Sequence, residues 1–122
     1  MNKRIKTKWL KALRSGKYKQ GKGGLAKPNR LGNIKHCCLG VLCDIYLKEH
    51  KQKWNPINKE DDEKLLSIGR SRETALLPPN VTLWAGLKED NPILKSTHES
   101  LAGLNDAGLT FKELAKRIEE EL

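Results

Sequence analysis

The chain has 122 residues, of which 37% are hydrophobic and 32% are charged, and its formal net charge is +9. This length favours one domain over residues 1–122, and the apolar periodicity described below excludes a disordered chain. No run approaches the roughly 20 apolar residues that span a bilayer, and no apolar segment follows the basic N-terminus, so we expect neither a membrane protein nor a signal peptide.

The basic residues are concentrated at the start of the chain. Residues 1–43 carry twelve Lys and Arg and no acid, whereas the remainder carries twelve basic and fifteen acidic residues. Such a one-sided field attracts nucleotides, nucleic acids or acidic protein surfaces. The three cysteines, two of them adjacent, indicate no disulfide framework and favour a reducing cytoplasm.

The first third predicts a helix followed by a hairpin. Apolar residues at near-helical spacing predict a helix over 5–15, and Gly16 is a natural terminator. Strands near 18–26 and 33–37 are predicted to form a hairpin around a turn rich in Pro, Asn and Gly.

The most apolar stretch, residues 37–48, predicts the central buried helix. Its expected buried face has helical spacing. Gly40 costs about 1 kcal/mol of helix propensity relative to Ala, so we expect another backbone to pass close to it. The predicted face is Cys38, Val41, Leu42, Ile45 and Tyr46.

Residues 49–63 are polar, include the acidic cluster 60–63, and predict a solvated connection. A strand over 65–68 is expected to end at Gly69, with Leu76 and Leu77 in a partner strand. A short helix should follow Pro78 and Pro79, and residues 87–97 are expected to be irregular.

The last helix has the clearest boundary. Thr110 and Glu113 have the spacing of a capping box, and Leu109 and Leu114 suit a hydrophobic staple. The predicted fold class is therefore α+β: a single small domain with an N-terminal helix, β-hairpins, a central buried helix and a C-terminal helix.

Several motifs resemble a large set of small phage and prophage proteins. They are Trp9…Ala12-Leu13-Arg14-Ser15-Gly16-x-Tyr18-x-Gln20-Gly21, then Cys37-Cys38-Leu39-Gly40-Val41-Leu42-Cys43-Asp44, and finally Leu104-Asn105-Asp106-x-Gly108…Phe111. The resemblance implies a phage origin. Small phage proteins often antagonise host defences. The resemblance extends to one class of them, which sequesters cyclic-nucleotide alarm signals. The resemblance assigns no ligand residue.

Residues 16–22 imitate a phosphate loop of the type G-x-x-x-x-G-K. A nucleotide-hydrolysing loop follows a strand and has Ser or Thr after its Lys, whereas here a helix precedes and Gly23 follows, so we reject that chemistry. Backbone N–H groups and nearby lysines could still cradle a phosphate. The alternative is a mobile hairpin with solvated lysines.

Metal binding and catalysis are not expected. His36 and the cysteines lack the paired spacing of a structural zinc site, so buried free thiols are favoured. No catalytic constellation is recognisable, and we predict a non-enzyme without a cofactor.

The predicted ligand-binding set combines charge, one aromatic ring and two polar residues. Arg14 could bind phosphate or its own helix terminus, Tyr18 could stack on a base, and Asn105 with Asp106 could read a nucleotide or form a structural turn. The full set is Arg14, Lys17, Tyr18, Lys19, Gln20, Lys22, Asn105 and Asp106.

The leading hypothesis is a cytoplasmic, phage-type anti-defence protein that sequesters a cyclic nucleotide without turnover, with a homodimer as an option. The first alternative is a basic nucleic-acid-binding protein, whose affinity would fall steeply with salt. The second is an inhibitor that binds a host defence protein complex.

Overall fold

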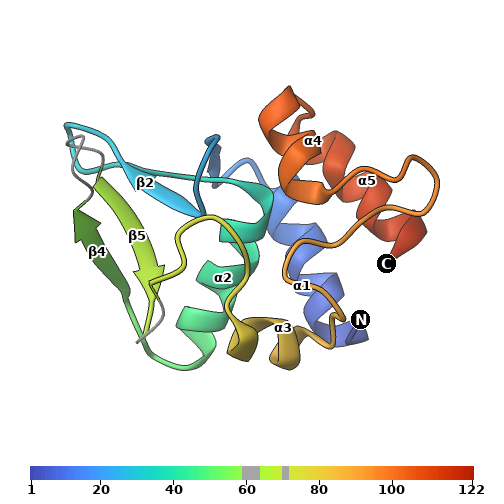
Figure 1. Cartoon of the computed structure of the whole chain (residues 1–122), viewed down its shortest axis with the longest axis horizontal. Helices are drawn as coiled ribbons and strands as arrows, with labels where there is room; N and C mark the ends of the chain where they lie inside the picture. The colour runs from blue at the N-terminus through green and yellow to red at the C-terminus, as the bar shows by residue number, and fades with distance from the viewer. Residues whose placement is uncertain (59–63, 70–71) are drawn as a thin grey trace.

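A buried helix, α2 (Cys38–Glu49), lies at the centre of the protein, between two small sheets and the other helices (Figure 1). The computed structural model describes residues 1–58, 64–69 and 72–122, which form five helices and five strands. The acidic cluster of the predicted 49–63 connection lies outside the described residues. Within the described part of the chain, no helix is both long and apolar enough to cross a membrane.

Helix α1 (Lys3–Arg14) packs against α2 through one apolar face. Asn2 caps its start by accepting a hydrogen bond from the Ile5 amide, and Trp9 is completely buried. The Trp9 indole donates to the Cys38 carbonyl at 2.9 Å, which joins α1 to the first turn of α2. The predicted N-terminal helix is confirmed.

Gly40 permits the close approach expected from the sequence. A Cβ atom at this position would lie 1.7 Å from the Leu25 carbonyl oxygen. The backbone before β2 therefore lies directly against α2. Helix α2 is buried on almost every side, more widely than the predicted face, because Leu39, Cys43 and Leu47 are buried as well.

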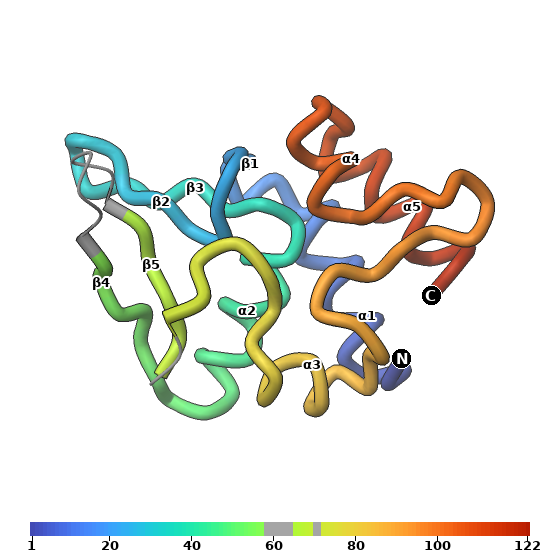
Figure 2. Tube along the Cα trace, in the orientation of Figure 1, coloured from blue at the N-terminus to red at the C-terminus, as the bar shows by residue number. Residues whose placement is uncertain are grey.

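The first sheet has the strand order β1-β3-β2 (Figure 2). Strands β2 (Ala26–Pro28) and β3 (Ile34–His36) form the predicted antiparallel hairpin, whereas β1 (Lys19–Gln20) runs parallel to β3. The prediction of one continuous strand over 18–26 was wrong, because the glycine-rich loop 21–24 separates β1 from β2.

The second sheet pairs β4 (Trp54–Asn58) with β5 (Lys64–Ile68). Two predictions were therefore wrong: residues 54–58 are not a solvated connection, and β5 does not pair with Leu76 and Leu77. Leu77 instead donates its amide to the Asp90 carbonyl at 3.0 Å. Pro56 fits because an edge strand tolerates a missing amide donor.

Three helices complete the α+β domain: α3 (Pro79–Ala85), α4 (Leu101–Ala107) and α5 (Phe111–Glu121). The capping box of Thr110 and Glu113 is present at the start of α5, as predicted. Helix α4 was not predicted. Asn105 and Asp106 lie in its last turn rather than in a turn of their own, and Gly108 ends it with a φ of 112°. The predicted fold class is confirmed.

Candidate nucleic-acid interface

Three lysines lie in one row across the first sheet. Lys19 pairs with Lys35 in the parallel β1–β3 register, and Lys35 pairs with Lys27 in the antiparallel β2–β3 register. Directly paired residues share one face of a sheet, with Cβ atoms about 5 Å apart in antiparallel pairs. We call Lys19, Lys35 and Lys27 the lysine row.

The opposite face of the same sheet packs on the protein. The next set of paired residues in the same three strands is Gln20, His36 and Ala26, and it lies on this opposite face. His36 and Ala26 are buried, whereas Lys19 and Lys35 are exposed. The alternation of side chains along each strand thus places the lysines outward.

The lysine row has no acidic counterpart within the described chain. None of its three ammonium groups forms an ion pair there. In contrast, three of the six basic residues of α1 form ion pairs with other elements: Arg4 and Lys8 both contact Glu49, and Arg14 contacts Glu119 at 3.0 Å. Among the described residues, the lysine row therefore belongs to the unpaired part of the basic N-terminal third, which also includes Lys3, Lys6 and Lys11 of α1.

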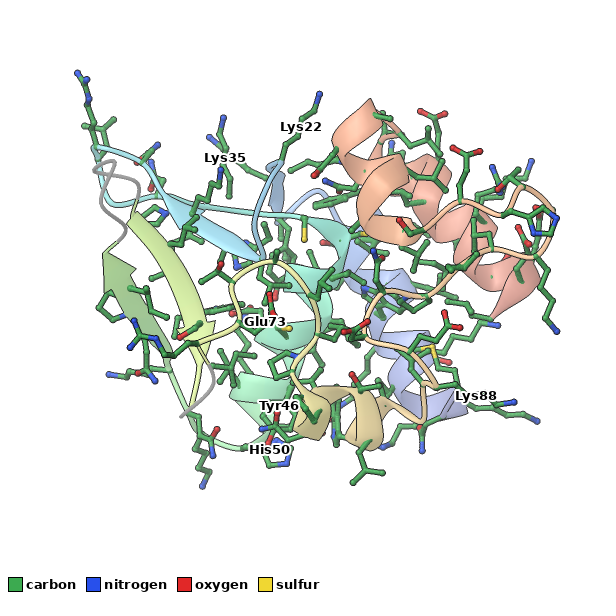
Figure 3. All side chains as sticks on the ribbon, viewed as in Figure 1. Lys22, Lys35, Tyr46, His50, Glu73 and Lys88 are labelled. Carbon is green, nitrogen blue, oxygen red and sulfur yellow. The ribbon has the colours of Figure 1, made fainter. Side chains whose placement is uncertain are left out.

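The glycine-rich loop holds a further lysine beside this row. The Gly23 amide donates to Asp106 Oδ1 at 3.1 Å, and the Gly21 amide donates to the His36 carbonyl at 2.8 Å. Lys22 lies between these two anchored residues. Its side chain and that of Lys35 point outward on the same side of the molecule (Figure 3).

Asn105 fixes the same loop from inside. Its Nδ2 group donates to the Gly21 carbonyl at 2.8 Å, and its Oδ1 atom accepts from the Cys38 amide at 3.1 Å and from Gln20 Nε2 at 2.9 Å. Asn105 is completely buried. The 105–106 pair was expected either to read a nucleotide or to form a structural turn. In the structure, both residues form internal hydrogen bonds.

Gln20 is also a junction within the protein. Its Nε2 group donates to the Leu109 carbonyl at 2.7 Å, and its Oε1 atom accepts from the Phe111 amide at 3.0 Å. These bonds connect β1 to the start of α5. Gln20 and Asn105 therefore position the lysine-bearing loop and strand, and both amide groups face inward.

Tyr18 is engaged rather than open for stacking. Its hydroxyl donates to Asp44 Oδ2, its ring meets the His36 ring edge-on at 5.1 Å, and the Lys48 ammonium lies 5.4 Å from its centroid. Trp54 Nε1 donates to the other Asp44 oxygen at 3.1 Å. These donors and Lys48 hold the pKa of Asp44 below its ordinary value despite its partial burial, whereas burial and the Asp44 contact raise the pKa of Tyr18.

His36 is buried between Tyr18 and Trp54. Neither ring nitrogen has a hydrogen-bond partner among the described residues. Burial lowers the pKa of this imidazole, so it is neutral at pH 7. The three cysteine thiols are free and buried, as predicted. Burial disfavours their charged thiolate form and therefore raises their pKa.

The hollows that the described residues form beside α3 and near the chain termini do not involve the predicted residues. Their volumes are about 900 and 310 Å³, respectively, and neither is lined by any residue of the predicted set. No group of three or more metal-ligating side chains occurs in the described ranges.

A family model described as "Domain of unknown function (DUF8296)" matches residues 1–122. The chain belongs to the DUF8296 family. No curated protein and no solved structure matches it. The family assignment covers the whole DUF8296 chain, and the phage origin implied by the motifs stays a prediction.

Sequence reasoning found the exposed lysines of this DUF8296 domain but missed how they are arranged. Lys27 and Lys35 were not in the predicted ligand set, although both belong to the lysine row. The alternation of Lys35 with Ile34 and His36 was the available signal. Register across strands that are separated in sequence could not be read from that alternation alone.

Proposed function

We propose that this protein binds the phosphate backbone of nucleic acid through the lysine row and Lys22. The lysine row is the observation that carries the proposal. Like charges placed directly opposite one another in a sheet are destabilising. A polyanion laid across the row would relieve this repulsion and release counterions.

The shape of the site favours an extended ligand over an enclosed one. Lys19 and Lys35 are exposed and Lys27 is half-buried on the outer sheet face, whereas the two hollows described above lie elsewhere. A backbone with regularly spaced phosphates matches a row of cations better than a small cyclic nucleotide does. Sequestration of a cyclic nucleotide and inhibition of a host defence complex both stay predictions.

The test is a salt titration of binding to a fluorescein-labelled DNA duplex, followed by fluorescence anisotropy. The variant Lys19→Gln/Lys27→Gln/Lys35→Gln should bind more weakly at low salt. The slope of log K against log salt is negative. If each lysine contacts one phosphate, this slope should become less steep by about 0.9 for each lysine removed.

A matched variant separates local recognition from net charge. Lys88→Gln/Lys95→Gln/Lys112→Gln removes three exposed lysines that lie outside the sheet, and both triple variants lower the formal charge from +9 to +6. Lys88 lies at the lower right of Figure 3, away from Lys22 and Lys35 at the top. Equal affinities for the two variants, or no binding by the unaltered protein at low salt, would contradict the proposal.

The same proteins can be titrated with cyclic di- and trinucleotides by calorimetry. Saturable 1:1 or 2:2 binding of one of these, with no binding to the duplex, would favour the sequestration hypothesis instead.

A further inference from the structure

An exposed leucine stands at the tip of the β2–β3 hairpin. Leu31 is 86% exposed, and Arg30 beside it is also exposed. Ile34, at the start of β3, is 36% exposed. This tip lies at the far end of the molecule from α5 (Figure 2).

The backbone of the tip is held in one conformation by its own hydrogen bonds. Asn29 Oδ1 accepts from the amides of Leu31 and Asn33, both at 2.9 Å. The Asn29 amide donates to the Asn33 carbonyl at 2.7 Å, and Gly32 adopts a φ of +81° to close the turn. Leu31 is therefore presented on a preordered turn, so little conformational freedom is lost when it enters a partner.

The hairpin combines this leucine with positive charge. Lys27 and Lys35 of the lysine row flank the turn on β2 and β3, and no acidic residue occurs between them in the sequence. Proteins that bend duplex DNA insert apolar side chains such as Leu between base steps from the minor groove, while nearby basic residues contact the backbone. Arginine is also favoured in narrow minor grooves.

A single-stranded ligand fits these features less well. Binding to single strands depends on aromatic rings that are open for base stacking. The large apolar side chains that are exposed in the described chain are Leu31, Ile34, Leu83 and Ile93, and none is aromatic. Tyr18, the predicted stacking ring, is held by Asp44 and packed against His36.

We infer that the partner is duplex DNA and that Leu31 enters its minor groove as a wedge between base pairs, while the lysine row holds the adjacent phosphates. This inference rests on the proposed function and adds a substrate class and a specific deformation. It predicts that binding bends the duplex and unstacks one base step.

The experiment uses the full chain and an A·T-rich duplex of about 25 base pairs, a length over which a protein-induced bend is measurable. Fluorophores at both ends report bending by energy transfer, 2-aminopurine at a central step reports unstacking, and anisotropy reports binding separately. The unaltered protein should bind and should increase both the energy transfer and the 2-aminopurine signal.

Leu31→Ser should retain binding but lose both signals, and Leu31→Phe should restore them. Ile93→Ser is the matched control, because Ile93 is 51% exposed and lies outside the hairpin. It should behave like the unaltered protein. Circular dichroism should show that all three variants are folded, since each replaced side chain is at least half exposed.

Three results would overturn the inference: binding by the unaltered protein without bending or unstacking, bending by Leu31→Ser equal to that of the unaltered protein, or tighter binding to single strands than to the duplex. All three leave phosphate-backbone binding intact. Absence of any binding in the anisotropy titration would instead refute the proposed function itself.

Discussion

Replacing Asn105 by Asp tests whether this residue maintains the fold or binds a ligand. Asn105 is fully buried and uses both ends of its amide: Oδ1 accepts from Cys38 and Gln20, and Nδ2 donates to the Gly21 carbonyl and to Asp106 Oδ1 at 3.2 Å. The Asn105→Asp change keeps the shape and the accepting oxygen. It removes both donated bonds.

The expected cost follows from what the new carboxylate would face. A second oxygen would stand against the Gly21 carbonyl and the Asp106 carboxylate, and a negative charge would be buried without a cationic partner. Leaving a buried polar group unsatisfied costs about 1–3 kcal/mol, and an uncompensated buried charge costs about 3–5 kcal/mol. The two costs do not add in full, because protonation of the new carboxyl can avoid the buried charge. We therefore expect Asn105→Asp to lower the free energy of unfolding by about 3–5 kcal/mol at pH 8.

Urea denaturation followed by tryptophan fluorescence measures this loss. The loss should shrink towards pH 5, because a protonated carboxyl regains one donor. Asn33→Asp is the control, since Asn33 is exposed and its side chain forms no hydrogen bond among the described residues. A loss below about 1 kcal/mol, the contribution of one ordinary hydrogen bond, would refute the structural role, and loss of ligand binding in a stable variant would favour a binding role.

Other consequences of the structure are open to measurement. Gly40→Ala should lower the free energy of unfolding by at least about 3 kcal/mol, as severe overpacking does, because the new methyl group would overlap the Leu25 carbonyl; a denaturation midpoint equal to that of the unaltered protein would contradict this contact. Arg4 and Lys8 hold the pKa of Glu49 down, from 4.5 to about 2, so their stabilisation is present above pH 4.5 and is lost as the pH falls towards 2. Glu49→Gln should therefore cost about 1 kcal/mol at pH 7 and progressively less at pH 3, and a difference that does not change with pH would refute this explanation. The three buried cysteines should react with a thiol reagent such as Ellman's reagent only on unfolding, and rapid labelling of the native protein would contradict their burial.

The elements that could be predicted are those specified by neighbouring residues. The capping box at Thr110 and the helical spacing of the 37–48 stretch are local patterns, and both were confirmed. Helix α4 was missed because Asn105, Asp106 and Gly108 are typical turn residues, and only Ser100 at its N-cap signalled its start. The helix depends on tertiary contacts, including the bonds of Asn105, that no local pattern contains.

The site shows the same division between local and non-local information. The basic segment was evident from composition, but the lysine row arises from pairing between β1, β2 and β3, which are separated by the glycine-rich loop and the hairpin turn. Gln20 was predicted as a member of the ligand-binding set, and Asn105 either to read a nucleotide or to form a structural turn. Their hydrogen bonds in the structure join segments that lie 85 positions apart in the sequence.

The turn at residues 29–33 closes on itself through the Asn29 side chain and backbone, and it lies beyond the last paired residues of β2 and β3. Surface turns tolerate insertions and deletions better than the strands that they connect. Members of the family could therefore differ in the length of the β2–β3 hairpin and in the residues of its turn, while they keep the same lysine row.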